Sequence, residues 1–247
     1  MHRFNWKKYG KQQMIMLLFL FLIGGPSEVW GQKNYAVPGR TYTGNLGANG
    51  EYGLRINKSG TYYFKNVTGG AICADADNMN VTLYFEGHNE LFGRSVKGEW
   101  STAGIDLNVA TRNPGQAGNT FTIKSKDPKN PAWLNCKGAG SSWAIVAGIG
   151  VTGDKTTLNI EGPIQVYANG GYYNDYKAPG IGGLCWDSKR FKGGNLNIKN
   201  GAYVYVDYIY REEIQVSKPS IIGWASITYY GTFLVPKQGG YFTPDFS

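Results

Sequence analysis

The chain has 247 residues and a formal net charge of +8. It is rich in glycine (36 residues) and tyrosine (18) and has no leucine-rich helical pattern, so we expect an all-β protein with many turns. The positive charge is mild and does not argue for nucleic acid as a partner.

The amino terminus has the three-part layout of a secretory signal. A lead with four basic residues precedes the apolar run Met14–Ile23, and small residues at Val29 and Gly31 come just before Gln32. The run has ten residues, fewer than the roughly 20 that a membrane span needs. We therefore predict a signal peptide over residues 1–31 and a protein that is secreted, periplasmic or on the cell surface. An uncleaved membrane anchor is the alternative, and only that alternative involves a membrane.

Removal of this segment takes away four basic residues and Glu28, which leaves 216 residues with a net charge of +5. That length suffices for one domain with a substantial core. We divide it into a lead-in over residues 32–51, a repeat region over residues 52–236 and a tail over residues 237–247.

The repeat region contains pairs of apolar residues separated by one polar residue. The first members are 38, 37, 38 and 31 residues apart, and the pairs are Leu83/Phe85, Phe121/Ile123, Leu158/Ile160, Leu196/Ile198 and Ile227/Tyr229. A second apolar position follows at Leu91, Leu134, Val166, Val204 and Val235, and a third element contains Ile105, Ile149, Ile181 and Ile222. Each unit thus holds three short strands joined by corners rich in glycine and asparagine.

One such unit cannot bury its apolar stripe alone, but stacked units form a continuous core. We therefore predict an all-β, single-domain, right-handed parallel β-helix of four to five coils, and we expect a monomer. The handedness follows the usual chirality of parallel connections.

The alignment also predicts which residues are neighbours in adjacent coils. One outward column is Glu86, Lys124, Glu161, Lys199 and Tyr230, in which acids and bases alternate. A column of small residues is Gly93, Cys136, Ala168 and Val206. The three cysteines, Cys73, Cys136 and Cys185, fit no zinc or redox motif, and we expect them to be buried small residues.

Two stretches carry a family resemblance. "INKSGTYYFKNVTGGAICADADNMNVTLYFEGHNEL" (Ile56–Leu91) resembles the opening coils of secreted bacterial β-helix carbohydrate-binding domains, and "GIGG" followed by "GGNLNIKNGAYVYV" is similar to their later coils. The resemblance covers Ile56–Val206. It implies binding of polysaccharide outside the cell, sometimes with calcium. The family's calcium ligands do not map onto this sequence, so we expect no cofactor and leave calcium open.

The sequence offers no convincing catalytic group. Glu86 and Glu161 share a predicted column, but Lys124 lies between them, so a charge ladder is favoured over the paired carboxylates of a hydrolase. The stretch Asp75–Asn78 groups oxygen ligands but is more typical of a polar corner than of a metal site. His88 is interpreted as a surface residue. We expect no catalytic residue and no metal site, and favour a protein that is not an enzyme.

Aromatic residues in the corner loops are the strongest functional indication. Sugar rings stack on aromatic planes while nearby amides or carboxylates bind the hydroxyls. The predicted ligand-binding residues are Trp143, Tyr172, Tyr173, Asp175, Tyr176 and Trp186. The basic stretches "KSKDPK" and "DSKRFKGG" could contact the acidic groups of an anionic glycan.

Alternative functions remain. The rings would instead cover the core if their role were structural. The same scaffold would also suit a polysaccharide lyase or glycoside hydrolase, or a structural or adhesive surface protein that binds other proteins.

Overall fold

The computed structural model describes residues 34–47, 53–95, 101–108, 118–141, 144–153, 155–173, 176–183, 185–186, 189–190, 194–206, 226–229, 232–237 and 240–242. All of them belong to one unit, Lys33–Ser247. The predicted signal peptide, Trp143 and Asp175 lie outside the described residues, as do Ile222 and Tyr230. Among the described residues there is no helix, and none that could cross a membrane. The all-β prediction is confirmed for this part of the chain.

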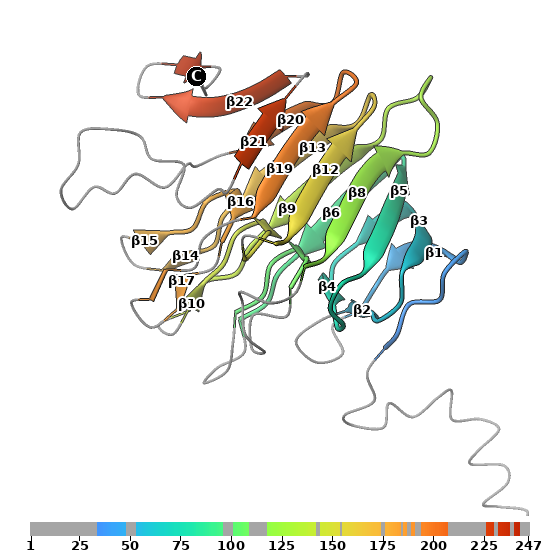
Figure 1. The fold of residues 1–247 in the computed structure, drawn as a ribbon, viewed down its shortest axis with the longest axis horizontal. Coiled ribbons are helices and arrows are strands. Elements are labelled where there is room, and N and C mark those ends of the chain that lie inside the picture. Colours follow the sequence, from blue (N-terminus) through green and yellow to red (C-terminus); the bar gives the residue numbers. More distant parts are fainter. Residues whose placement is uncertain are drawn as a thin grey trace, which may run out of the picture. The chain divides into compact units, whose positions relative to one another are not determined.

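A first stack of parallel strands contains the repeated apolar pairs. Neighbouring strands run in the order β3, β5, β8, β12, β19 and β21, and β1 covers the free edge of β3. The strands are β1 (Thr41–Asn45), β3 (Gly60–Thr68), β5 (Asn80–Glu86), β8 (Thr120–Ser125), β12 (Thr157–Glu161), β19 (Asn195–Lys199) and β21 (Ser226–Tyr229). Figure 1 shows this stack as a series of arrows that follow the colour order of the chain.

A second stack continues from the end of β3. Its order is β3, β6, β9, β13, β20 and β22, again in parallel, and β23 closes it in antiparallel orientation. The strands are β6 (His88–Phe92), β9 (Trp133–Lys137), β13 (Gln165–Asn169), β20 (Tyr203–Val206), β22 (Thr232–Lys237) and β23 (Gly240–Phe242). Because β3 pairs with β5 through Gly60–Lys65 and with β6 at Thr68, the two stacks are one sheet that changes direction at this strand.

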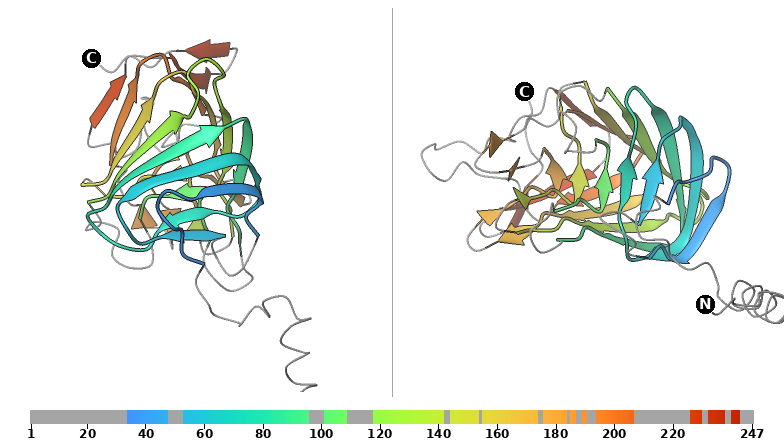
Figure 2. Two further views of the ribbon diagram at one scale, coloured as in Figure 1. Left: turned by 90° about the vertical axis from the view of Figure 1, so that its right-hand side faces the viewer. Right: turned by 90° about the horizontal axis from the view of Figure 1, so that it is seen from below.

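A third stack is a separate sheet of five short parallel strands. These are β2 (Leu54–Ile56), β4 (Ile72–Ala74), β7 (Ile105–Asp106), β11 (Ile149–Gly150) and β16 (Ile181–Gly182). The chain visits the first, second and third stacks in turn and then returns to the first, one strand further along. The stacks enclose the core between them (Figure 2).

The core consists of inward columns that run from strand to strand. Ile123, Ile160 and Ile198 are directly paired and fully buried, and Leu158 pairs with Phe121 and Leu196 in the same way. Fully burying such side chains contributes about 1.5–3 kcal/mol each. The predicted pairing along β8, β12, β19 and β21 is confirmed, as is the isoleucine column of β7, β11 and β16.

The predicted register between β5 and β8 is wrong by two residues. Leu83 pairs with Ile123 instead of Phe121, and Phe85 pairs with Ser125. In β5 the side chains of Val81, Leu83 and Phe85 are all buried, and the two that pair with Phe121 and Ile123 are Val81 and Leu83. The Phe85 ring instead stacks on that of Phe64 with 5.2 Å between centroids. An additional inward position therefore precedes the corner in this coil.

The pairing of β6 with β9 in the second stack also differs from the prediction by two residues. Asn89, and not Leu91, pairs with Leu134, and Leu91 takes the place in the small-residue column that had been predicted for Gly93. Cys136, Ala168 and Val206 share that column as predicted. The buried Asn89 amide accepts the Val67 N–H and donates to three backbone carbonyls, so hydrogen bonding replaces apolar packing there. At the far end, Phe233 pairs with Val204, the position predicted for Val235.

Corners between the first and second stacks use residues with positive φ. Gly162 has φ 81° and follows β12, and the equivalent corner after β19 holds Asn200 (φ 56°) and Gly201 (φ 78°). Glycine and asparagine adopt this conformation more readily than other residues. The predicted glycine- and asparagine-rich corners are therefore confirmed here.

Candidate functional site

The chain forms a closed neck at three corners where it passes from the second stack to the third. We call residues 94–102 hairpin 1, residues 139–146 hairpin 2 and residues 171–178 hairpin 3. A backbone hydrogen bond closes each neck: from Thr102 N–H to Arg94 O (3.0 Å), from Val146 N–H to Ala139 O (3.0 Å) and from Ala178 N–H to Gly171 O (2.8 Å). Each of three consecutive repeats therefore has one such neck at the same corner.

The first coil turns this corner without a hairpin. Only three residues lie between Thr68 and Ile72, whereas 14 lie between their paired counterparts Glu90 and Ile105. Gly69 and Gly70, both with φ 66°, make the short turn. The hairpins are therefore additions to a corner that closes without them, and loops of this kind carry function on a rigid scaffold.

Glycine is required at each hairpin neck because two backbone segments touch there. A Cβ added to Gly93, Gly138 or Gly170 would lie 1.8, 1.9 or 1.7 Å from the carbonyl oxygen of the returning strand. No real Cβ makes such contacts. The regular glycine spacing of the sequence thus has a second cause besides corner conformation.

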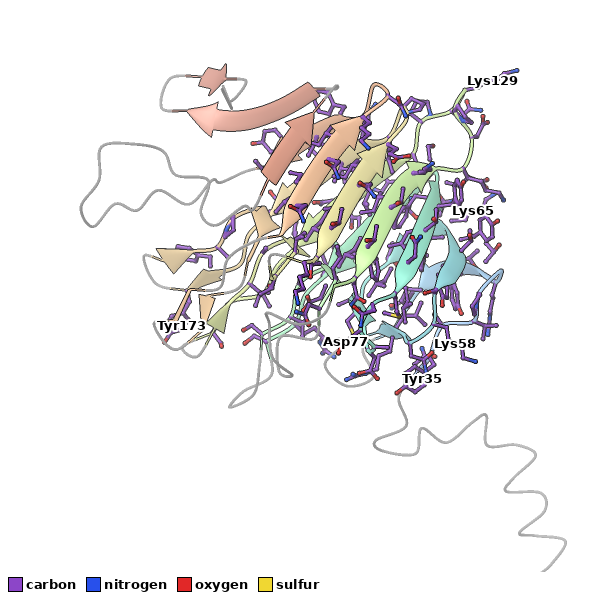
Figure 3. All side chains as sticks on the ribbon, in the orientation of Figure 1. Tyr35, Lys58, Lys65, Asp77, Lys129 and Tyr173 are labelled. Atoms are coloured by element: carbon purple, nitrogen blue, oxygen red, sulfur yellow. The ribbon has the colours of Figure 1, made fainter. Side chains whose placement is uncertain are left out.

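Hairpin 3 contains the predicted tyrosines. Tyr172 and Tyr173 form β14 (Tyr172–Tyr173), which pairs in antiparallel orientation with β15 (Tyr176–Lys177), so Tyr173 lies opposite Tyr176. The exposed fractions of Tyr172 and Tyr173 are 63% and 38%, and no described ring stacks on either of them. Figure 3 shows Tyr173 on the opposite side of the view from Lys65 and Lys129.

Trp186 lies in a small antiparallel sheet that begins in hairpin 2. The strands are β10 (Ala144–Ile145), β17 (Cys185–Trp186) and β18 (Lys189–Arg190), and Trp186 pairs with Ala144 and Lys189. Hairpin 2 also contacts hairpin 3, since the Gly171 N–H donates to Val146 O at 2.8 Å. Four predicted site residues therefore lie on neighbouring backbone segments: Tyr172, Tyr173, Tyr176 and Trp186.

A second set of aromatic residues was not predicted from the sequence. Along the outer face of the second stack, His88 stacks on Trp133 at 3.7 Å, and Tyr167 lies 5.4 Å from Trp133, 6.1 Å from Tyr203 and 5.7 Å from Tyr205, measured between centroids. Alternation in "WLNCK", "QVYAN" and "YVYV" would have indicated their outward direction.

This outer row differs from hairpin 3 in what its rings contact. Trp133 has a neighbouring ring on each side, His88 and Tyr167, so the row resembles the cross-strand pairs that stabilise sheets. A sugar needs an uncovered ring face. Tyr172 and Tyr173 are exposed, whereas Trp133 is only partly exposed and lies between two rings.

The carboxylates of the first stack are paired with lysines. The predicted pairing of Glu86 with Lys124 is wrong. Glu86 contacts Lys65 at 2.5 Å and Lys126 at 3.4 Å, and the hydrogen bond from Lys65 is the main cause of its lowered pKa. Glu161 contacts Lys124 at 2.8 Å, which raises the pKa of that lysine. Both acids thus pair with lysines on neighbouring strands, but the predicted single column from Glu86 through Lys124 to Glu161 does not form, because Lys124 pairs with Tyr84.

Asp75, the first residue of the acidic stretch, is buried, and its carboxylate contacts Arg55 and Tyr35. Arg55 Nη1 lies 3.1 Å from Asp75 Oδ1, and the Tyr35 hydroxyl donates to Oδ2 at 2.7 Å. Within the described ranges, no three His, Cys, Asp or Glu side chains gather as metal ligands would. His88 is exposed, as predicted, and its Nε2 lies 3.4 Å from Glu90.

Comparisons of the chain with protein-family models, curated proteins and solved structures found no match.

Proposed function

We propose that the strand stacks are the three faces of a right-handed parallel β-helix of four to five coils over residues 52–236. The cyclic order of strands and the register of paired residues between consecutive coils support this fold. In this arrangement each coil positions its corner hairpin directly beside the hairpin of the next coil.

We further propose that the protein is exported and binds polysaccharide without cleaving it. The observation that carries this proposal is the exposure of two adjacent tyrosine side chains, Tyr172 and Tyr173, at hairpin 3. Exposed aromatic rings on a loop held by a rigid scaffold are a common basis of ligand recognition. The proposed binding residues are those predicted from the sequence: Trp143, Tyr172, Tyr173, Asp175, Tyr176 and Trp186.

The charge of the hairpin region favours an anionic glycan. The backbone of Lys177 pairs with that of Tyr172, and the backbone of Lys189 pairs with that of Trp186. Lysines at these register positions suit a sugar that carries a carboxylate or sulfate. The protein would act as a monomer outside the cytoplasm, in the periplasm, at the cell surface or in the medium.

The test is a glycan array probed with the purified protein, its Y172A/Y173A double variant and a matched Y63A/Y84A control. Tyr63 and Tyr84 are half-buried on the first stack, and their rings stack on each other at 5.6 Å. We expect retention on polysaccharide that the hairpin variant loses by about tenfold or more, since stacked rings contribute about 0.5–1.5 kcal/mol each beyond their buried area. The control should retain glycan.

Three results would contradict the proposal. Retention on no glycan would leave a structural or adhesive role, and unchanged retention of a folded Y172A/Y173A variant would place the site elsewhere. New reducing ends or unsaturated uronides after incubation would make the protein an enzyme.

A further inference from the structure

Two columns of short polar side chains run across the outer face of the first stack. The paired residues are Asn80, Thr120, Thr157 and Asn195 in one column and Thr61, Thr82, Thr122, Asn159 and Asn197 in the other. We call these nine residues the Thr/Asn array. All of them are half-buried or exposed, and the residues that alternate with them along each strand are buried in the core. They come from β3, β5, β8, β12 and β19, which are neighbouring arrows in Figure 1.

The array contains only threonine and asparagine, although the next outward column does not. Two residues further along the same strands, the outward side chains are Tyr63, Tyr84, Lys124, Glu161 and Lys199. Charged residues are among those found most often on protein surfaces, so nine outward positions without a charge require an explanation. The array is therefore an uncharged surface bordered by a charged and aromatic column.

Hydrogen bonds and stiff side chains fix the polar groups of the array. Asn159 Nδ2 donates to Thr122 Oγ1 at 3.3 Å, and Asn197 Nδ2 donates to Asn159 Oδ1 at 2.8 Å. In the other column, Asn195 Nδ2 donates to Thr157 Oγ1 at 3.5 Å. Threonine is β-branched, which restricts its χ1 angle. The array thus loses little further conformational freedom when something binds to it.

The backbone sets the repeat of the array in two directions. Adjacent strands lie about 4.8 Å apart, and residues two apart along a parallel strand are separated by about 6.6 Å. The pairing between β3 and β19 is in register throughout these columns, so five strands give a length of about 19 Å. This two-dimensional repeat is close to that of the water molecules on the prism faces of ice.

Charge and composition distinguish between possible occupants. An uncharged surface is complementary to a neutral partner. Sugar-binding sites use aromatic rings, and the cores of protein interfaces are enriched in aromatic residues and arginine, whereas the array contains neither. Ice is neutral and regular, and it is bound through hydrogen bonds. An amide carries two N–H groups, so Asn159 and Asn197 each keep one that has no partner among the described residues.

We propose that the Thr/Asn array binds ice. Water molecules held by its hydroxyl and amide groups take up the spacing of the ice surface and join it, so that many weak contacts form together. A charged side chain would orient water in a pattern that ice does not share, which accounts for the composition of the array. The array has no residue in common with hairpin 3, so this inference goes beyond the proposed glycan-binding function and does not rest on it.

The experiment grows ice slowly on a cooled metal finger in a solution of the purified protein and measures how much protein enters the ice. Thr122→Lys and Thr157→Lys each place a charge in one column of the array. The matched control is Gln165→Lys, which places the same charge at an exposed position of the second stack. We expect the ice to take up wild-type protein and Gln165→Lys equally, and to exclude both array variants as it excludes serum albumin. Circular dichroism melts check that each variant is folded.

Exclusion of the wild-type protein from ice would overturn the inference, and this result depends on no variant. Equal uptake of wild-type protein and a folded Thr122→Lys variant would also overturn it, because another surface would then contact the ice. If ice excluded the wild type and Thr122→Lys lost retention on polysaccharide, the array would be a sugar-binding surface instead. Uptake of wild-type protein that binds no glycan would support the inference while the proposed function fails.

Discussion

Substitution of Ile160 by aspartate tests whether the inward columns carry the fold. Ile160 is fully buried in β12 between its paired neighbours Ile123 and Ile198, both also fully buried. Loss of its side chain costs about 2–5 kcal/mol, by analogy with large-to-small core substitutions. An unpaired buried carboxylate adds about 3–5 kcal/mol. The sum of about 5–10 kcal/mol is comparable to the whole stability of a typical domain, about 5–15 kcal/mol.

We therefore expect Ile160→Asp to be unfolded at neutral pH or close to it, and Ile160→Ala to be folded but about 2–5 kcal/mol less stable than wild type. Guanidinium titrations followed by far-ultraviolet circular dichroism measure both. The control is Asn159→Asp on the outward face. There the Asn159 amide donates to the Thr122 hydroxyl at 3.3 Å, and loss of this bond costs about 0.5–1.5 kcal/mol. A wild-type midpoint for Ile160→Asp would refute the assignment of this column to the core.

Three further predictions concern the neck, a charge pair and a thiol. Gly138→Ala should lower the unfolding midpoint more than Gly162→Ala does, because the added Cβ meets a carbonyl oxygen at 1.9 Å, whereas Gly162 has open space and only an unfavourable φ; similar losses would contradict the neck contact. Lys124→Gln should cost less than about 1 kcal/mol, since its contact with Glu161 is partly exposed. The raised pKa of Lys124 means that this contribution is present below the ordinary lysine pKa of 10.5 and is lost as pH rises through the higher folded-state value, so denaturation curves of the two proteins should converge in strong alkali. Burial raises the pKa of the Cys136 thiol, so peptide mapping should find it unmodified by iodoacetamide in native protein at pH 8 and modified after unfolding; rapid native labelling would contradict its burial.

The repeat pattern alone determined the strand class, the cyclic order of strands and much of the register. Apolar pairs at near-constant spacing, such as Leu158/Ile160 and Leu196/Ile198, predict direct neighbours because a stack buries one face of every coil. The corner glycines followed from the same logic, because a corner with positive φ favours glycine. The position of the tyrosines in a corner loop was also evident.

Other features depended on packing that sequence spacing does not contain. In β5, Val81, Leu83 and Phe85 are all buried, and spacing alone does not show which two of them pair with Phe121 and Ile123. The necks at Gly93, Gly138 and Gly170 depend on close approach of backbones, which looks the same in sequence as a flexible turn. The join between hairpins 1, 2 and 3 uses main-chain hydrogen bonds, which any residue except proline can donate, so no residue pattern marks it. Tertiary structure alone decided that these loops form a row, because only stacking of the coils brings their backbones together.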